Sequence, residues 1–207
     1  MWNQLEMLWG LVAPEQIPLW LKVIYTLFVC VLVPAYWKHY GPGNFLWFSD
    51  ISILVALVAL WLESPLLTSV ISLAVLILDI AWNLDFFATL IFGTSITGLS
   101  AYMFKHETRR LIRGLSLFHV FFPVLLIWML SRLGYDKRAL VIQTVLAWVV
   151  LPLSYFFTRR SENVNWVHGF GNEPYRFLPV PLHILLLMIL FPLVIYLPTH
   201  LLLQMIF

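Results

Sequence analysis

Long apolar blocks separated by short polar gaps are the feature that most limits how this chain folds. Several blocks approach the roughly 20 residues that an α-helix needs to cross the hydrocarbon core of a membrane. Of the 207 residues, 62% are hydrophobic and 11% are charged, against about 25% charged in a typical soluble domain. So few charges do not coat a water-facing surface. The sequence therefore predicts an all-α, polytopic transmembrane helix bundle that forms one integral membrane domain over residues 1–207.

The apolar blocks predict about seven transmembrane spans. Their approximate bounds are Ile17–Trp37, Phe45–Leu62, Pro65–Trp82, Phe86–Phe104, Leu111–Ser131, Ala139–Thr158 and Val180–Leu203. Only three residues, 83–85, separate the third span from the fourth, so we expect a tight antiparallel hairpin there. Small and polar residues fill the second half of the fourth span, which leaves a broken helix and six full crossings as the alternative. Pro192 and Pro198 predict a kink in the last span.

The segments outside these spans suggest a topology. Residues 1–16 are expected to form a short interfacial segment, and residues 159–179 an extramembrane loop. With the N-terminus inside, Lys22 joins the basic residues of 105–113 and 159–176, which gives eight positive charges against four on the other side. Positive loop charges favour the cytoplasm. We therefore expect a cytoplasmic N-terminus and a C-terminus on the opposite side, in an inner membrane of the bacterial type.

Composition also excludes several classes of function. A net charge of +2 is too small to suggest nucleic acid as a partner. Cys30 is the only cysteine, so neither an intrachain disulfide nor a cysteine metal cage is possible. The histidines lack a close ligand pair, so no metal site is predicted. No nucleotide or dinucleotide motif is present, so the sequence leaves the cofactor unknown. The expected partners are membrane lipids and other membrane subunits.

A histidine in the middle of the fifth span is the first candidate for function. Arg113, Ser116 and His119 recur every three residues, so they lie along one face of the expected helix. A polar stripe on an apolar helix indicates a face that points into the bundle. His119 is then a packing residue bonded to a neighbouring helix, a general base or proton carrier, or a metal ligand.

The start of the second span carries the next candidates. Asp50 either anchors the positive end of that helix or orients a histidine, and Ser49 is a candidate nucleophile. Three further residues, together with Arg113, are candidates for binding. Asp79 is expected near the membrane interface, Asn165 in a long loop over the mouth of the bundle, and His200 beside a cavity after the proline kink.

Two short segments resemble a known family. Residues 45–50 read Phe-Leu-Trp-Phe-Ser-Asp after a Tyr-Gly turn, and residues 114–119 read Gly-Leu-Ser-Leu-Phe-His before Pro123. Both are similar to segments of the androgen-induced family of multi-pass hydrolases, which cleave branched fatty-acid esters with an intramembrane Thr and His, and to related acyltransferases. The resemblance implies that His119 is the base. Trp47 stands where that family has its Thr, so Ser49 or Ser116 would have to be the nucleophile.

These features lead to three functional hypotheses. The first is an intramembrane hydrolase or acyltransferase that acts on lipid esters, with His119 as general base and Asp50, Ser49 and Ser116 in its catalytic site. The second is a non-catalytic assembly or structural subunit of a membrane complex. The third is a small-solute transporter or channel lined by the small, polar fourth span and the kinked last span.

Overall fold

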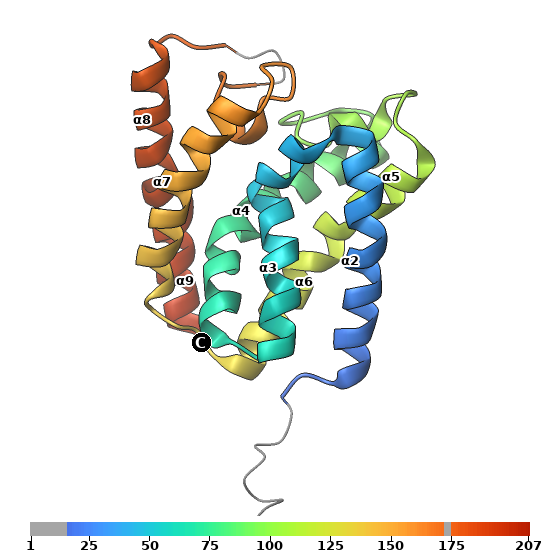
Figure 1. The fold of residues 1–207 in the computed structure, drawn as a ribbon, viewed down its shortest axis with the longest axis vertical. Coiled ribbons are helices and arrows are strands. Elements are labelled where there is room, and N and C mark those ends of the chain that lie inside the picture. Colours follow the sequence, from blue (N-terminus) through green and yellow to red (C-terminus); the bar gives the residue numbers. More distant parts are fainter. Residues whose placement is uncertain (1–15, 172–174) are drawn as a thin grey trace, which may run out of the picture.

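The structure is a computed structural model that describes residues 16–171 and 175–207, and within these residues the chain is a bundle of helices (Figure 1). The predicted interfacial segment lies almost wholly outside the described residues. The helices are α2 (Leu19–Tyr40), α3 (Phe48–Leu62), α4 (Pro65–Phe92), α5 (Arg110–Ser116), α6 (Phe118–Leu133), α7 (Ala139–Phe157), α8 (Val180–Leu190) and α9 (Leu197–Ile206). Short 3₁₀ turns are η1 (Pro42–Leu46), η2 (Ala101–Phe104) and η3 (Val164–Trp166), and η4 (Phe191–Tyr196) is a π-helix.

The helices run up and down between two ends of the bundle. One end, here named the cavity end, holds residues 41–47, 93–109, 158–171 and 175–179, and it is uppermost in Figure 1. The far end holds residues 63–64 and 134–138. The Gln16 N–H donates to Glu63 Oε2 at 3.0 Å, so residue 16 also lies at the far end, and Figure 1 shows the C-terminus there. The two ends of the described chain are therefore on the same side of the bundle, whereas seven crossings would have put them on opposite sides.

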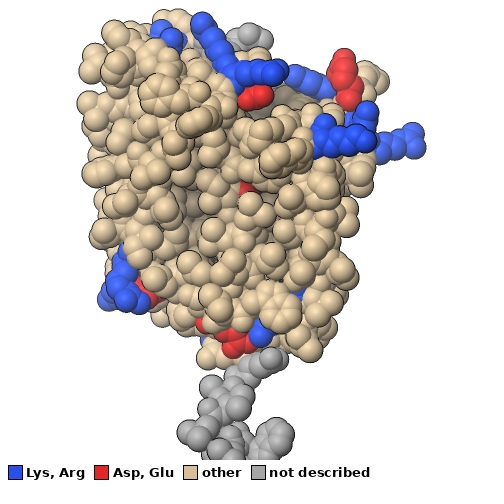
Figure 2. Space-filling view, in the orientation of Figure 1, with Lys and Arg blue, Asp and Glu red and all other residues tan. Residues whose placement is uncertain are grey.

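Within the described residues, five helical segments are long and apolar enough to cross a membrane. They are Leu19–Tyr40, Pro65–Phe92, Arg110–Leu133, Ala139–Phe157 and Val180–Ile206, with α3 as a shorter apolar helix. Large apolar side chains are exposed on each of them, such as Leu27, Ile91, Val124, Val149 and Leu201. On the face of the bundle drawn in Figure 2, the middle is almost free of charged residues, and the charged residues gather at the two ends. The predicted all-α membrane bundle is thus confirmed in its class, and the predicted count of seven spans is not.

α4 is the central helix of the bundle. It packs against α3, α6, α7 and α9, and it is the most buried of the five long helices. Pro65 occupies its first turn, where a missing N–H costs nothing, and the Ser64 side chain accepts a hydrogen bond from the Leu67 N–H at 3.3 Å. Gly93 ends it with φ of +69°, a left-handed conformation that glycine adopts without strain.

The predicted hairpin between the third and fourth spans is wrong. α4 runs straight through residues 83–85, because no glycine or proline interrupts it there. Residues 93–100 form a loop instead of a helix, and the buried carboxylate of Asp85 holds this loop. Asp85 accepts hydrogen bonds from the backbone N–H groups of residues 96, 97, 98 and 100 and from the hydroxyls of Ser95 and Ser100. The described residues thus contain five helices of spanning length and the shorter helix α3.

The predicted grouping of the basic residues is also wrong at two positions. Lys22 lies at the far end, where its Nζ is 2.9 Å from Glu63 Oε1. Lys38 lies in the last turn of α2, at the cavity end. The cavity end still carries eight of the twelve Lys and Arg residues, but residue 16 is on the opposite side from them.

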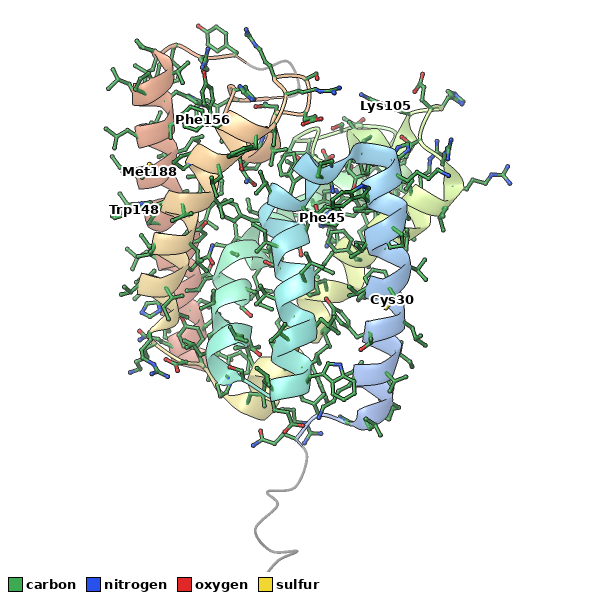
Figure 3. All side chains as sticks on the ribbon, viewed as in Figure 1. Cys30, Phe45, Lys105, Trp148, Phe156 and Met188 are labelled. Carbon is green, nitrogen blue, oxygen red and sulfur yellow. The ribbon has the colours of Figure 1, made fainter. Side chains whose placement is uncertain are left out.

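The irregularity expected in the last span takes the form of the π-helix η4. Pro192 lies at its start and has no N–H to donate to the preceding turn. The α-helical hydrogen-bond pattern resumes in α9. Pro198 lies in the first turn of α9, where its missing N–H is tolerated. The Trp148 indole N–H donates to the Met188 carbonyl at 2.9 Å, which joins α7 to α8 above this segment (Figure 3).

Asp85→Asn is expected to destabilise the cavity-end loop. The amide keeps the shape of the carboxylate but replaces one acceptor oxygen with a donor NH₂ group, which would face groups that themselves donate. Hydrogen bonds to a charged group contribute about 1.5–3 kcal/mol each, so we expect a loss of roughly 3 kcal/mol. Thermal unfolding in detergent measures the loss, with Ser95→Ala, which removes one of these bonds, as the milder control. Equal effects of the two variants would contradict the anchoring role of Asp85.

Candidate functional site

A cavity of about 510 Å³ lies at the cavity end of the bundle, between the helices and the loops that cover them. This volume is within the range of sites for small molecules and cofactors. Its walls come from α2, α3, α4 and the α5–α6 junction, and from residues 98–105 and 161–171. Six of the eight residues that the sequence marked as candidates line it: Ser49, Asp50, Asp79, Ser116, His119 and Asn165.

A histidine–aspartate pair lies in the cavity wall. His119 Nδ1 is 2.7 Å from Asp79 Oδ1, and the Asp79 side chain is 3% exposed. When Asp79 is ionised its carboxylate only accepts hydrogen bonds, so Nδ1 then carries the proton of this bond and Nε2 is the basic nitrogen. The His119 side chain is 13% exposed. Asp79 is therefore a buried partner of the histidine rather than the interfacial residue that was expected.

A break in the helix places this histidine. The predicted single fifth span is divided at Leu117 into α5 and α6, and His119 lies in the first turn of α6. Pro123, four residues later, has no N–H to bond the His119 carbonyl. The free carbonyl instead accepts a hydrogen bond from Asn83 Nδ2 at 2.6 Å. One helix, α4, thus holds both the ring of His119 and its backbone.

Aromatic rings on two sides restrict the imidazole. The Trp82 ring stacks on it with centroids 4.6 Å apart and an angle of 24° between the planes, and the Phe118 ring lies 3.9 Å away. These two rings hold the plane of the imidazole in place. The rings leave His119 in the cavity wall, so the histidine is neither sealed nor turned toward lipid.

Hydroxyl groups gather beside the histidine. Ser116 Oγ is 2.7 Å from the Tyr36 hydroxyl, and it also interacts with the Tyr102 hydroxyl. Burial raises the pKa of Tyr102 well above its ordinary value, so this phenol stays a proton donor at physiological pH. Among the described residues, no hydrogen bond joins Ser116 to the His119 ring, whose bonded partner is Asp79. Ser116 is therefore next to the base but engaged with tyrosine.

Asn165 builds the cavity wall from the long loop. Its Oδ1 accepts from the Phe48 N–H at 3.2 Å, and its Nδ2 donates to the Leu46 carbonyl at 2.7 Å. Asn165 thereby caps the start of α3, the task that the sequence allowed for Asp50. Asn165 and Trp166 both have left-handed backbones, with φ of +50° and +59°, which cost on the order of 1–3 kcal/mol each in a non-glycine residue. Asn165 thus lies in the loop that lines the cavity.

Two predicted binding residues lie away from the cavity. The Arg113 guanidinium donates to the Lys105 carbonyl, so it braces the loop before α5 instead of lining the cavity. The predicted stripe therefore holds for Ser116 and His119 only, since both line the cavity and Arg113, earlier on α5, does not. His200 is at the far end, where its Nδ1 is 2.6 Å from the Tyr135 hydroxyl.

Several important side chains were not identified from the sequence. Tyr36, Tyr102 and Trp82 carried no signal, because aromatic residues make up 16% of the chain and occur in every block. Asn83 was assigned to a turn. Pro123 is the sequence signal that could have led to Asn83. A proline four residues after His119 leaves the His119 carbonyl without its helical partner, so that carbonyl needs another donor.

The fold and the cavity define a class of protein: a helical bundle of the integral membrane type with an internal polar site. No protein-family model, curated protein or solved structure matches the chain. The resemblance to the androgen-induced family stays a prediction. Across residues 16–171 and 175–207 there is no group of three or more His, Cys, Asp or Glu side chains arranged to hold a metal ion.

Cysteine substitution on α3 is expected to show that water reaches the cavity. In a Cys30→Ala background, Ser49→Cys should react with a small water-soluble thiol reagent, because Ser49 lines the cavity. Ser52→Cys, one turn further along α3, should stay unreactive, because Ser52 is 1% exposed and lies outside the cavity lining. The modified fraction is measured by mass spectrometry of the purified protein. Equal reactivity at the two positions would rule out a water-filled cavity on this face.

Proposed function

We propose that the protein is an intramembrane enzyme, a hydrolase or acyltransferase that acts on lipid esters with His119 as general base. The observation that supports this most is the 2.7 Å bond between His119 and Asp79 in the wall of the cavity. The carboxylate orients the imidazole and stabilises its protonated form, as in other hydrolytic sites in which a histidine accepts a proton. Asp79 is then a positioning residue and His119 the group that touches the reacting atoms.

The proposed reaction moves one proton through His119. Its Nε2 accepts the proton of an attacking hydroxyl, whose oxygen bonds to the carbonyl carbon of the ester. The proton then passes to the alcohol oxygen as the old carbon–oxygen bond breaks. The hydroxyls of Tyr36 and Tyr102 are donors for the carbonyl oxygen, which becomes negative as the attack proceeds.

Ser116 is the favoured nucleophile. It lies three residues before His119, in the same wall, and it is 1% exposed and bonded to Tyr36. For attack, its hydroxyl has to turn from Tyr36 toward the histidine. The acyl group is then carried on Ser116, and a second round with water releases a fatty acid, whereas a lipid alcohol gives a new ester. Ser49, also in the lining, is the second candidate.

The geometry favours an enzyme over the other two hypotheses. A packing histidine needs one hydrogen-bonding neighbour, and an uncharged one suffices. Here the histidine faces a buried carboxylate, which is costly to keep in an apolar bundle, and both lie in the wall of a cavity. Titratable groups held together in a cleft by burial and a charged partner are typical of active sites.

We further propose that the cavity end faces the cytoplasm. Eight of the twelve Lys and Arg residues lie there, and short loops rich in these residues stay on the cytoplasmic side. Residue 16 and the C-terminus are at the far end, so both would be on the opposite side. Compared with the orientation expected from the sequence, the basic loops and the C-terminus keep their sides and residue 16 changes side, because three crossings instead of four precede residue 105.

Replacing the histidine is expected to abolish turnover without loss of folding. His119→Ala should lower the release of fatty acid from a panel of lipid esters about 10²–10⁴-fold, the usual contribution of a general base. Asp79→Asn should lower kcat with little change in KM, because Asp79 positions the base. Products are measured by mass spectrometry. The control is His106→Ala, which removes an exposed loop histidine.

Three results separate the roles in this prediction. Ser116→Ala should also remove turnover, whereas Ser49→Ala should not; the reverse would make Ser49 the nucleophile. Full activity in both would mean that His119 activates water or an alcohol directly. The enzyme proposal is falsified if His119→Ala keeps wild-type turnover, or if purified wild-type protein turns over no lipid ester while it stays folded.

The proposed orientation predicts sided labelling in intact bacterial cells. In a Cys30→Ala background, Lys137→Cys at the far end should react with a membrane-impermeant maleimide added outside. His106→Cys at the cavity end should react only after the cells are permeabilised. Gel shift of the labelled protein measures both. The opposite pattern would place the cavity end outside.

A further inference from the structure

A second carboxylate in the cavity has no role in the proposed reaction. Asp50 lies in the first turn of α3 and is 4% exposed, and its side chain lies next to that of Asn44. Its Oδ1 has no hydrogen-bond partner among the described residues, although Asp50 lines the cavity. A buried carboxylate oxygen without a donor is unfavourable, so this position calls for a donor or a cation from a ligand.

Aromatic side chains surround this carboxylate. Tyr36 and Tyr40 are close enough to Asp50 to interact with it electrostatically, and their rings meet at 89° with centroids 5.4 Å apart. Across the same cavity, the Trp47 and Trp166 rings meet at 90° with centroids 6.3 Å apart. All four aromatic residues line the cavity together with Asp50. Aromatic rings beside a carboxylate are a combination with which proteins bind substituted ammonium groups.

The charge of the cavity has the same preference. Within the described part of the chain, its lining contains the acidic residues Asp50, Asp79 and Glu162 and one basic residue, Lys105. Lys105 belongs to the loops at the outer rim (Figure 3). The exterior of the cavity end is basic, as Figure 2 shows, so the negative interior is not a consequence of the overall charge. A cation is therefore favoured inside the cavity and an anion outside it.

We propose that the Asp50 region of the cavity binds a quaternary ammonium group. A quaternary ammonium has no N–H to donate and is weakly hydrated, so its positive methyl groups suit aromatic faces and one carboxylate oxygen. In terms of the proposed function, on which this part of the inference rests, the ammonium group belongs to the lipid substrate, with its phosphate toward Lys105 and its ester toward His119. A free solute with the same group shares this chemistry.

The binding of choline to the full-length protein in a non-ionic detergent tests the site. The neutral control is 3,3-dimethylbutan-1-ol, in which carbon replaces the ammonium nitrogen. Choline should raise the melting temperature of the wild type and of His119→Ala, and the neutral analogue should not. Asp50→Asn should weaken choline binding at least tenfold, whereas Asp136→Asn, at the far end, should leave it unchanged. Equal effects of choline and its analogue, or unchanged binding in Asp50→Asn, would overturn the proposal.

A second variant covers the case in which Asp50→Asn does not fold. Tyr40→Leu keeps the carboxylate and removes one half-buried aromatic wall, so it should weaken choline binding while the binding of the neutral analogue does not change. Wild-type affinity for choline in this variant would contradict the aromatic site.

Lipid probes identify the source of the ammonium group. Lysophosphatidylcholine should compete with choline, and lysophosphatidylglycerol should not; this result supports a lipid headgroup. Competition by choline-type solutes alone supports the ammonium site but assigns it to a free ligand. If choline binds while no lipid ester is turned over, the proposed function fails and the site stands. If turnover is present but Asp50→Asn leaves the headgroup preference unchanged, only the ammonium site fails.

Discussion

Three polar side chains within two turns of α4 hold the cavity end together. Asp79 bonds the ring of His119, Asn83 bonds the His119 backbone, and Asp85 gathers the loop of residues 93–100. Each is buried or partly buried in the central helix, where competition from water is small and hydrogen bonds to charged groups are strong. The positions of His119, of the loop of residues 93–100 and of Tyr102, which follows that loop, therefore depend on one helix.

The chain has few charged residues, and three of its carboxylates are buried inside the bundle. A charge at the middle of a bilayer costs on the order of 3 kcal/mol, so each intramembrane carboxylate needs partners or a function. Asp85 has six hydrogen bonds, and Asp79 has the histidine. Asp50 and Asp79 each keep one oxygen without a partner among the described residues. Asp79 has the histidine as its charged partner, whereas Asp50 has none and stands next to Tyr36 and Tyr40, which is why Asp50 carries the inference of an ammonium site.

Hydropathy alone misplaced the fourth span for a physical reason. Residues 86–104 are apolar at their start and small and polar at their end, so their average resembles that of a weak transmembrane helix. The start is the last part of α4, and the end is a loop whose backbone N–H groups bond Asp85. A carboxylate can satisfy irregular backbone only where the fold brings it close, and the composition of a window does not record that distance.

The sequence by itself determined the membrane class, the helical bundle, and the place of Ser116 and His119 on an inward face, because these follow from apolar periodicity and from the cost of polar groups in lipid. The tertiary structure decided what those residues meet. Asp79 is 40 residues from His119, Tyr36 is 80 from Ser116, and Asn165 is 117 from Phe48. Such pairings depend on which helices pack together and on the depth of each residue in the bundle. Local pattern contains neither, so the histidine was found from the sequence and its partner only in the fold.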